Sequence, residues 1–190
     1  MAKPKSGDKR NAILSAAIQV FAERGLGAPT AAITSAAGIA EGSLFTYFKT
    51  KDELINALYR ELKWELADAM MSGFPRRQTV RHRLQHVWNG YVLWGAGKPE
   101  QQKVLKQIQV WRGLTEESKQ AGFAPFTEIQ RIAADAVTQR IYNDIPQALI
   151  QAALVALAEM TMDFMVRDPE RAEMYRTAGF EMLWAGITRR

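Results

Sequence analysis

Apolar residues recur every three or four positions along the first part of the chain, which is the period of an amphipathic α-helix. A first helix is predicted to end at Gly25, and its apolar face consists of Ile13, Ala16, Ala17, Val20 and Phe21. Two short helices follow, at about residues 30–37 and 41–48. Gly38 stands between them, and glycine accepts the positive φ angle that a tight turn between helices requires.

The third helix is predicted to have two different faces. Leu44, Phe45 and Phe48 are expected to hold it to the core, and the outward positions are Ser43, Thr46 and Tyr47. A short rigid helix with small hydrogen-bonding groups on its outer face fits the major groove of DNA, which is about 12 Å wide. Two short helices joined by a glycine turn therefore predict a helix-turn-helix at about residues 30–48.

A long fourth helix is predicted after Thr50. Thr50 and Glu53 have the spacing of a capping box, in which two side chains bond to free N–H groups at the start of a helix. One stripe of this helix consists of Leu54, Leu58, Leu62 and Leu66. We place the boundary between a domain of residues 1–54 and a domain of residues 55–190 within this helix, which is therefore expected to transmit movement between them.

The rest of the chain is also predicted to be helical. The expected helices span residues 76–96, 99–112, 125–142, 146–167 and 169–187, with a long break at about 113–125. Neither strand alternation nor an internal repeat is evident. The sequence thus predicts an all-α fold, with an N-terminal three-helix domain that contains the helix-turn-helix and a larger helical domain after it.

The composition narrows the class of protein. The chain has 190 residues and no cysteine, which excludes disulfides and thiolate zinc sites and suits a reducing cytoplasm. The most apolar segment, Ala148–Val166, is interrupted by Gln151, Glu159 and Asp163, so we expect a buried helix and no membrane span. We expect no secretory signal, because no unbroken apolar stretch follows the first lysines.

Positive charge is concentrated at the start of the chain. Residues 1–51 contain seven lysine and arginine residues and three acidic ones, a net charge of +4, whereas the other 139 residues contain 18 and 17, a net charge of +1. Such a distribution is expected for a protein whose partner is a polyanion, although a solvated basic tail gives the same pattern. Lys49 and Lys51 follow the third helix directly, and the N-terminus of the fourth helix adds to the attraction for a phosphate oxygen.

Residues 10–54 resemble the DNA-binding domain of the TetR family of bacterial regulators. The matching stretches are RNAILSAAIQVFAERG and PTAAITSAAGIAEGSLFTYFKTKDEL. The matching positions are Ile13, Ala16, Ala17, Phe21, Gly25, Ile33, Ala37, Gly38, Gly42, Leu44, Phe48, Lys51 and Leu54. The resemblance implies a DNA-binding regulator, expected to be a cytoplasmic repressor that a small-molecule inducer releases from a double-stranded DNA operator.

The chain departs from the family pattern at the recognition helix. Phe45 stands where the family usually has tyrosine, and Ala40 replaces the usual serine at the helix start, which should cost about 1 kcal/mol as a lost N-cap. We therefore assign the hydroxyl contacts to Thr30, Thr46 and Tyr47. The predicted DNA-binding residues are Lys9, Arg10, Thr30, Ser43, Thr46, Tyr47, Lys49 and Lys51, with Lys5 as a further tail contact.

The resemblance also implies a homodimer through the last two helices, at about 146–167 and 169–187. The sequence supports this independently, because the first of these helices is apolar on more than one face and must be covered on all sides. The second contains small residues, among them Gly179, which permit close helix contacts. A deep core within one chain is the alternative explanation.

In the family the middle helices enclose an inducer pocket. The residues predicted to line one here are His86, Trp88, Tyr91, Trp111, Phe126, Met160 and Phe164. An aromatic cluster at helical spacing is more often part of a plain core. Asn89, Arg112, Glu159 and Asp163 are polar groups near them that would orient a ligand.

His82 and His86 stand four positions apart on a predicted helix, as in a metal clamp. The residues between them lack the glutamate of a zinc hydrolase, so a solvated helix face is the simpler interpretation and no metal or other cofactor is expected. A metal-responsive DNA-binding sensor using His82 and His86 is the alternative function. No nucleophile elbow, phosphate-binding glycine loop or dinucleotide motif is evident, so no enzyme is expected.

Overall fold

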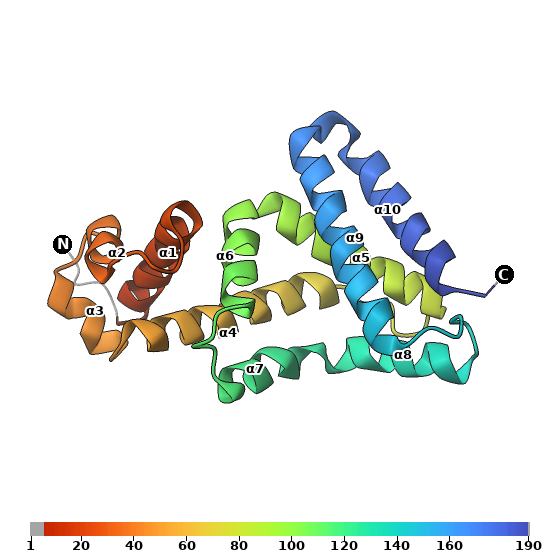
Figure 1. The fold of residues 1–190 in the computed structure, drawn as a ribbon, viewed down its shortest axis with the longest axis horizontal. Coiled ribbons are helices and arrows are strands. Elements are labelled where there is room, and N and C mark those ends of the chain that lie inside the picture. Colours follow the sequence, from red (N-terminus) through yellow and green to blue (C-terminus); the bar gives the residue numbers. More distant parts are fainter. Residues whose placement is uncertain (1–5, 190) are drawn as a thin grey trace. The chain divides into compact units, whose positions relative to one another are not determined.

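The structure is a computed structural model that describes residues 6–189, which are mostly helical, with turns and loops between the helices and one isolated bridge between Tyr142 and Thr188 (Figure 1). The predicted all-α fold is confirmed. Residues up to Trp64 together with Pro99–Phe123 form one compact unit, called the first unit, and Glu65–Lys98 together with the residues after Phe123 form the second unit. The limits of these units do not fall at residue 54. The division into a DNA-binding domain of residues 1–54 and a second domain of residues 55–190 remains a prediction. Lys5 lies outside the described residues.

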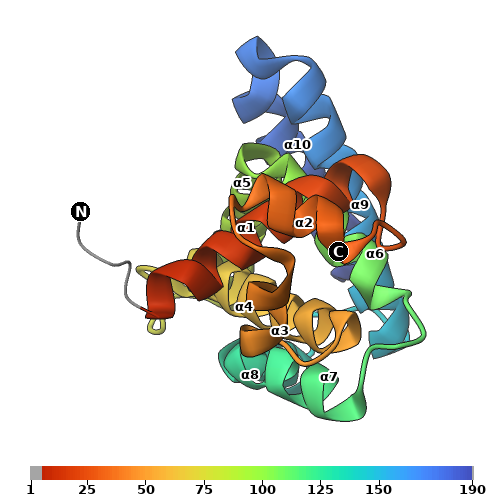
Figure 2. The same cartoon turned by 90° about the vertical axis from the view of Figure 1, so that its left-hand side faces the viewer.

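The first unit contains the three N-terminal helices, which are α1 (Ser6–Arg24), α2 (Thr30–Ala36) and α3 (Glu41–Tyr47), and the start of α4 (Lys51–Met71). Figure 2 shows α2 and α3 beside α1. Ile13, Phe21 and Leu44 are fully buried, as their spacing predicts. Gly38 has a φ of 64°, so the turn between α2 and α3 uses the left-handed region that glycine accepts without strain.

The start of α4 is capped nearly as predicted. The Thr50 hydroxyl accepts a hydrogen bond from the N–H of Glu53 at 3.1 Å. The Glu53 carboxylate accepts from the N–H of Lys49 at 2.8 Å, one residue before the usual partner. The side chains thus fix where α4 leaves the helix-turn-helix.

Two further helices belong to the first unit, α6 (Pro99–Gln109) and α7 (Glu116–Phe123). The predicted break at 113–125 was wrong, because it contains α7. A Cβ at Gly122 of this helix would lie 2.5 Å from Cε1 of Tyr59. The missing side chain lets α7 pack directly on α4.

The second unit contains the end of α4, α5 (Val80–Gly97), α8 (Thr127–Thr138), α9 (Gln147–Arg167) and α10 (Ala172–Ile187). Short 3-10 helices precede α8 (Ala124–Phe126) and α10 (Pro169–Arg171). Helices α9 and α10 lie side by side and pack against α5 (Figure 1). Helix α8 ends four residues before the predicted 142, since Arg140 has a φ of 52° and residues 139–146 form a loop.

Trp88 and Phe180 form the centre of the second unit and are fully buried. The Trp88 Nε1 donates to the carbonyl of Arg176 at 3.0 Å. A Cβ at Gly179 would lie 2.3 Å from Oγ1 of Thr161 and 2.8 Å from Cζ2 of Trp88. The role predicted for Gly179 between two chains was therefore wrong, because its close contacts lie within one chain.

Helix α9 is long and apolar enough to cross a membrane by length and composition, with a mean hydropathy of 1.6 in its most apolar window, of which 28% is buried. Core helices of soluble proteins share these features, and α9 packs on both α5 and α10.

Candidate nucleic-acid interface

The helix-turn-helix is held by three buried side chains. Ile33 of α2 and Leu44 of α3 are fully buried, and Phe48 follows α3 with 2% of its surface exposed. Ala40 is the N-cap of α3 and makes no side-chain cap bond, while Glu41 places a negative charge in the first turn. The helix is therefore fixed mainly by packing from below, which leaves its outer face available.

The outer face of α3 contains the three residues predicted there and one more. Thr46 is exposed, and Ser43 and Tyr47 are half-buried. Phe45 is also exposed, to 45%, so its predicted place in the core was wrong. Leu44 and Phe48 fill the core side of this short helix, and Phe45 is rotated about 100° from Leu44 at 3.6 residues per turn.

Phe45 is a candidate contact that the sequence analysis missed. An exposed phenyl ring among hydroxyl groups is suited to apolar contact with the methyl group of thymine in the major groove. The available signal was the register of the helix, because a helix of seven residues buries one narrow face and Leu44 already occupied it.

The lysine and arginine residues predicted to contact DNA differ in the interactions that their side chains make within the protein. Lys49 is exposed, and the Nζ of Lys51 lies 5.9 Å from the centroid of the Phe21 ring. The Arg10 Nη1 donates to Oε1 of Glu61 at 2.9 Å, and its guanidinium carbon lies 5.7 Å from the centroid of the Phe48 ring. Arg10 thus joins α1 to α4 in addition to any contact with phosphate.

Lys9 and Ser43 line one open pocket of about 430 Å³ between α1 and the helix-turn-helix. The turn residues Gly38 and Ala40 complete its wall. Thr30 is half-buried at the first residue of α2. The structure therefore brings Lys9 and Ser43 together, while Thr30 stands at the start of a different helix.

The residues predicted to line a ligand pocket are distributed over several places. Trp111 belongs to the first unit, and the others belong to the second. Trp88 is part of the packed core. Phe126 is half-buried in the short helix before α8. The seven-residue pocket therefore stays a prediction.

Two of these residues have a polar setting. Burial, together with the negative charge of Glu159, raises the pKa of Tyr91 to about 12, so its hydroxyl stays protonated at neutral pH. The ring of His86 meets that of Phe74 edge-on at 5.8 Å. His86 and His82 line one open pocket of about 420 Å³ on α5. In residues 6–189 no group of three or more metal-ligating side chains includes them.

Met160 and Phe164 lie on the outer face of the α9–α10 pair. They line a shallow apolar pocket of about 190 Å³ with Tyr175 and Met182. Phe164 is 47% exposed and Met182 is 56% exposed. These side chains form an apolar surface that nothing in the described chain covers.

Comparison with known proteins points to one family. The model of the bacterial regulatory proteins of the tetR family matches residues 13–58. A crystal structure from Shewanella sp. PV-4, described as a tetR family transcription regulator, is 25% identical, with a TM-score of 0.84 over 96% of this chain and 99% of the other. Residues 13–58 therefore match the TetR family, and the whole chain is similar in fold to a TetR-family regulator. The family comprises transcription regulators rather than enzymes.

Two further proteins are similar to this chain, one over part of its sequence and one in fold. The HTH-type transcriptional repressor KstR2 of Rhodococcus jostii is 37% identical over 81 residues, which cover 40% of this chain and 39% of KstR2. The regulator FadR of Bacillus subtilis, solved with stearoyl-CoA, is 19% identical, with a TM-score of 0.70 over 93% of this chain and 98% of FadR. The curated relative is thus matched over about two fifths of its length, and the likeness to FadR is one of fold.

Proposed function

We propose that this protein is a sequence-specific DNA-binding repressor of the bacterial cytoplasm that acts as a homodimer. The observation that carries the proposal is the outer face of α3, where Phe45 and Thr46 are exposed and Tyr47 is half-buried on a helix-turn-helix that is packed against the core from its other side. Lys49 and Lys51 follow directly, and Lys9 lines a pocket at the same motif. Side chains that contact base edges are thus flanked by cations for the phosphates.

Selection of DNA from a random library tests this proposal. The wild-type protein should enrich a palindrome whose half-sites lie one helical turn, roughly 34 Å, or a multiple of it apart, because each subunit of a two-fold dimer contributes one recognition helix. Enrichment of no sequence over many rounds would contradict the proposal.

Salt dependence identifies the phosphate contacts. The variant Lys51→Ala should weaken binding to all duplexes almost equally and make the slope of log affinity against log salt shallower by about 1. Lys119→Ala is a matched control, because Lys119 lies on α7 and pairs with Glu116 at 2.6 Å. A loss confined to the selected operator would show that Lys51 contacts a base.

The apolar face of α9 and α10 is proposed as the dimer interface. Besides Phe164 and Met182, its exposed residues are Leu149, Val155, Met160, Val166 and Met174. So many exposed apolar side chains on one pair of helices are unusual in a soluble monomer, whereas they are usual at an interface between subunits. The proposal moves Met160 and Phe164 from the predicted ligand pocket to this interface.

We also propose that a small-molecule inducer releases the repressor from DNA. FadR of Bacillus subtilis, which shares the fold, was solved with stearoyl-CoA, so this acyl-CoA is the first compound to test. An inducer acts only by binding one conformation better than the other. If stearoyl-CoA acts here, it should release the operator and change the tryptophan fluorescence at the same concentration.

A further inference from the structure

Residues 99–123 pack on the DNA-binding helices from two sides. The Gln107 Nε2 of α6 donates to the carbonyl of Phe21 in α1 at 3.4 Å. Helix α7 approaches α4 so closely that Gly122 has no room for a Cβ beside Tyr59. The helix-turn-helix is therefore part of a larger body that includes α6, α7 and the turn between them.

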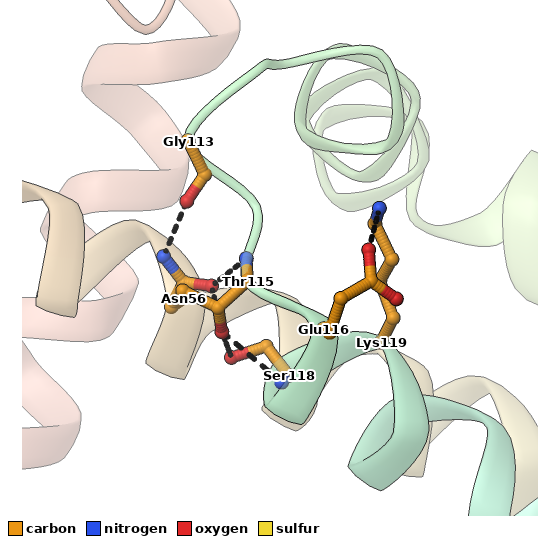
Figure 3. A network of polar contacts seen from close by, with 6 residues as sticks. All are labelled: Asn56, Gly113, Thr115, Glu116, Ser118 and Lys119. Atoms are coloured by element: carbon orange, nitrogen blue, oxygen red, sulfur yellow. Dashed lines mark hydrogen bonds and ion pairs between the residues drawn. The ribbon is translucent and has the colours of Figure 1, made fainter.

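Asn56 of α4 is the polar centre of this packing (Figure 3). Its Nδ2 donates to the carbonyls of Asp52 at 2.9 Å and Gly113 at 3.0 Å. Its Oδ1 accepts from the N–H of Thr115 at 3.0 Å and from the Thr115 hydroxyl at 3.2 Å. An asparagine amide has two donors and can accept two bonds. Asn56 uses all four, with 6% of its surface exposed.

The hydrogen bonds continue from Asn56 into α7. Thr115 precedes the helix, and its Oγ1 accepts from the N–H of Ser118 at 3.2 Å and lies 3.0 Å from the Ser118 hydroxyl oxygen. The Arg60 Nη1, one turn of α4 beyond Asn56, donates to Ser118 Oγ at 2.6 Å. Figure 3 shows Asn56, Thr115 and Ser118 between α4 and the start of α7.

A purely apolar contact would not specify this arrangement as closely. Apolar side chains tolerate small shifts of one helix over another, whereas a buried amide loses bonds when either partner moves. Three of the four hydrogen bonds of Asn56 join it to the segment Gly113–Thr115. Their partners are the Gly113 carbonyl, the Thr115 N–H and the Thr115 hydroxyl. A shift of this segment therefore either carries α4 with it or breaks these bonds.

We propose that Asn56 is a positioning residue that links the turn between α6 and α7 to α4 and so couples that turn to the recognition helix. The inference rests on the proposed DNA-binding function and adds a means of regulation to it. A molecule that moves residues 110–115 changes the placement of α4, which begins directly after the helix-turn-helix. The arrangement held by Asn56 is taken as the one that binds DNA, so DNA binding should in turn stabilise the segment 110–118, because coupling is reciprocal.

Hydrogen exchange measured by mass spectrometry tests this coupling in the wild-type dimer with and without the selected operator. Operator binding should slow exchange in residues 110–118 several-fold. In Asn56→Leu, exchange of this segment without DNA should be at least tenfold faster, the operator should no longer slow it, and operator affinity should fall about tenfold. Glu116→Gln is the matched control, since it removes only the exposed Lys119–Glu116 pair on the same helix.

A second pair of variants keeps Asn56 in place. Thr115→Val removes the hydroxyl and should behave like Asn56→Leu, whereas Thr115→Ser retains the hydroxyl and should restore the wild-type response to DNA. This rescue distinguishes positioning from loss of folding, should Asn56→Leu fail to fold. Wild-type-like slowing by the operator in Asn56→Leu or Thr115→Val would overturn this inference alone. Failure of the wild type to bind any selected DNA would instead overturn the proposed function, and the coupling with it.

Discussion

Arg10 and Glu61 join the first helix to the fourth, with Arg10 Nη1 2.9 Å from Glu61 Oε1. Their side chains are 37% and 53% exposed, so the pair should contribute less than about 1 kcal/mol to stability. Arg10 is a predicted phosphate contact, and in this structure its guanidinium is paired with the carboxylate of Glu61. The carboxylate should therefore compete with DNA phosphate for this guanidinium.

The first prediction follows from this competition. Arg10→Ala should make the salt slope of operator binding shallower by about 1 while lowering the free energy of unfolding by less than about 1 kcal/mol. Glu61→Gln should tighten binding, because it releases Arg10 and removes a negative charge. Urea unfolding and binding titrations at several salt concentrations measure both effects. An unchanged slope in Arg10→Ala would show that Arg10 stays on Glu61 in the complex.

The second prediction concerns the exposed ring of Phe45. Phe45→Ala should weaken operator binding by about 1–2 kcal/mol, since the ring buries apolar surface against a thymine methyl group. Replacing that thymine by deoxyuridine should weaken binding of the wild type and leave the variant unaffected. Val110→Ala, at an exposed apolar residue of the same unit, is the control. Equal losses for both proteins on deoxyuridine would exclude the contact.

The third prediction concerns the dimer. Phe164→Glu or Met182→Glu should raise the dimer dissociation constant at least about 100-fold, because each would bury a charge without a partner. Val137→Glu changes an equally exposed apolar residue on α8 and should leave the dimer intact. Sedimentation equilibrium measures both. A wild-type dissociation constant in Phe164→Glu and Met182→Glu would place the interface elsewhere.

The fourth prediction concerns Lys63, which is buried beneath the Phe123 ring, with its Nζ 4.8 Å from the ring centroid. Burial lowers its pKa from 10.5 to about 8. Below pH 8 the Lys63 amine is therefore charged in both the folded and the unfolded protein, and the charge costs more free energy in the folded one. Between pH 8 and 10.5 only the folded protein releases the proton, and the cost is relieved. Lys63→Met should therefore be more stable than the wild type at pH 7, by on the order of 2 kcal/mol after allowance for the cation–π contact.

Urea unfolding at pH 7 and at pH 10 tests the sign. The advantage of Lys63→Met should shrink between these values, as the wild type gains stability relative to the variant. An advantage that is the same at both pH values would show that the Lys63 amine does not titrate as its burial implies.

The helix positions followed from the sequence where the apolar period was regular. The faces of α1 and α4 and the turn at Gly38 emerged as predicted, because each is fixed by local spacing and backbone preference. Helix α7 was missed, since it lies within the break predicted at 113–125, and its close packing on Tyr59 through Gly122 is a tertiary contact that the sequence does not show. Gly179 was wrongly predicted to lie between two chains, because spacing along the sequence does not show whether a small residue faces its own chain or another.

In the candidate site, too, some features could be predicted from the sequence and others could not. The outward positions of Thr46 and Tyr47 follow from the helical register. The exposure of Phe45 follows from the same register, but it was not predicted because an aromatic residue was assumed to be buried. The hydrogen bonds of Asn56 were not predictable, because Gly113 and Thr115 are 57 and 59 residues away along the chain. Such contacts depend on tertiary packing, which no local pattern contains.

The central claim is that α3 recognises a DNA sequence. Its most direct test is the affinity of the wild type and of the double variant Thr46→Ala/Tyr47→Ala for the selected operator and for a scrambled duplex of the same length, at one salt concentration. The double variant should lose about 2–6 kcal/mol of binding free energy on the operator, at 1–3 kcal/mol for each contact, and almost none on the scrambled duplex. Wild-type affinity of the double variant for the operator would contradict it.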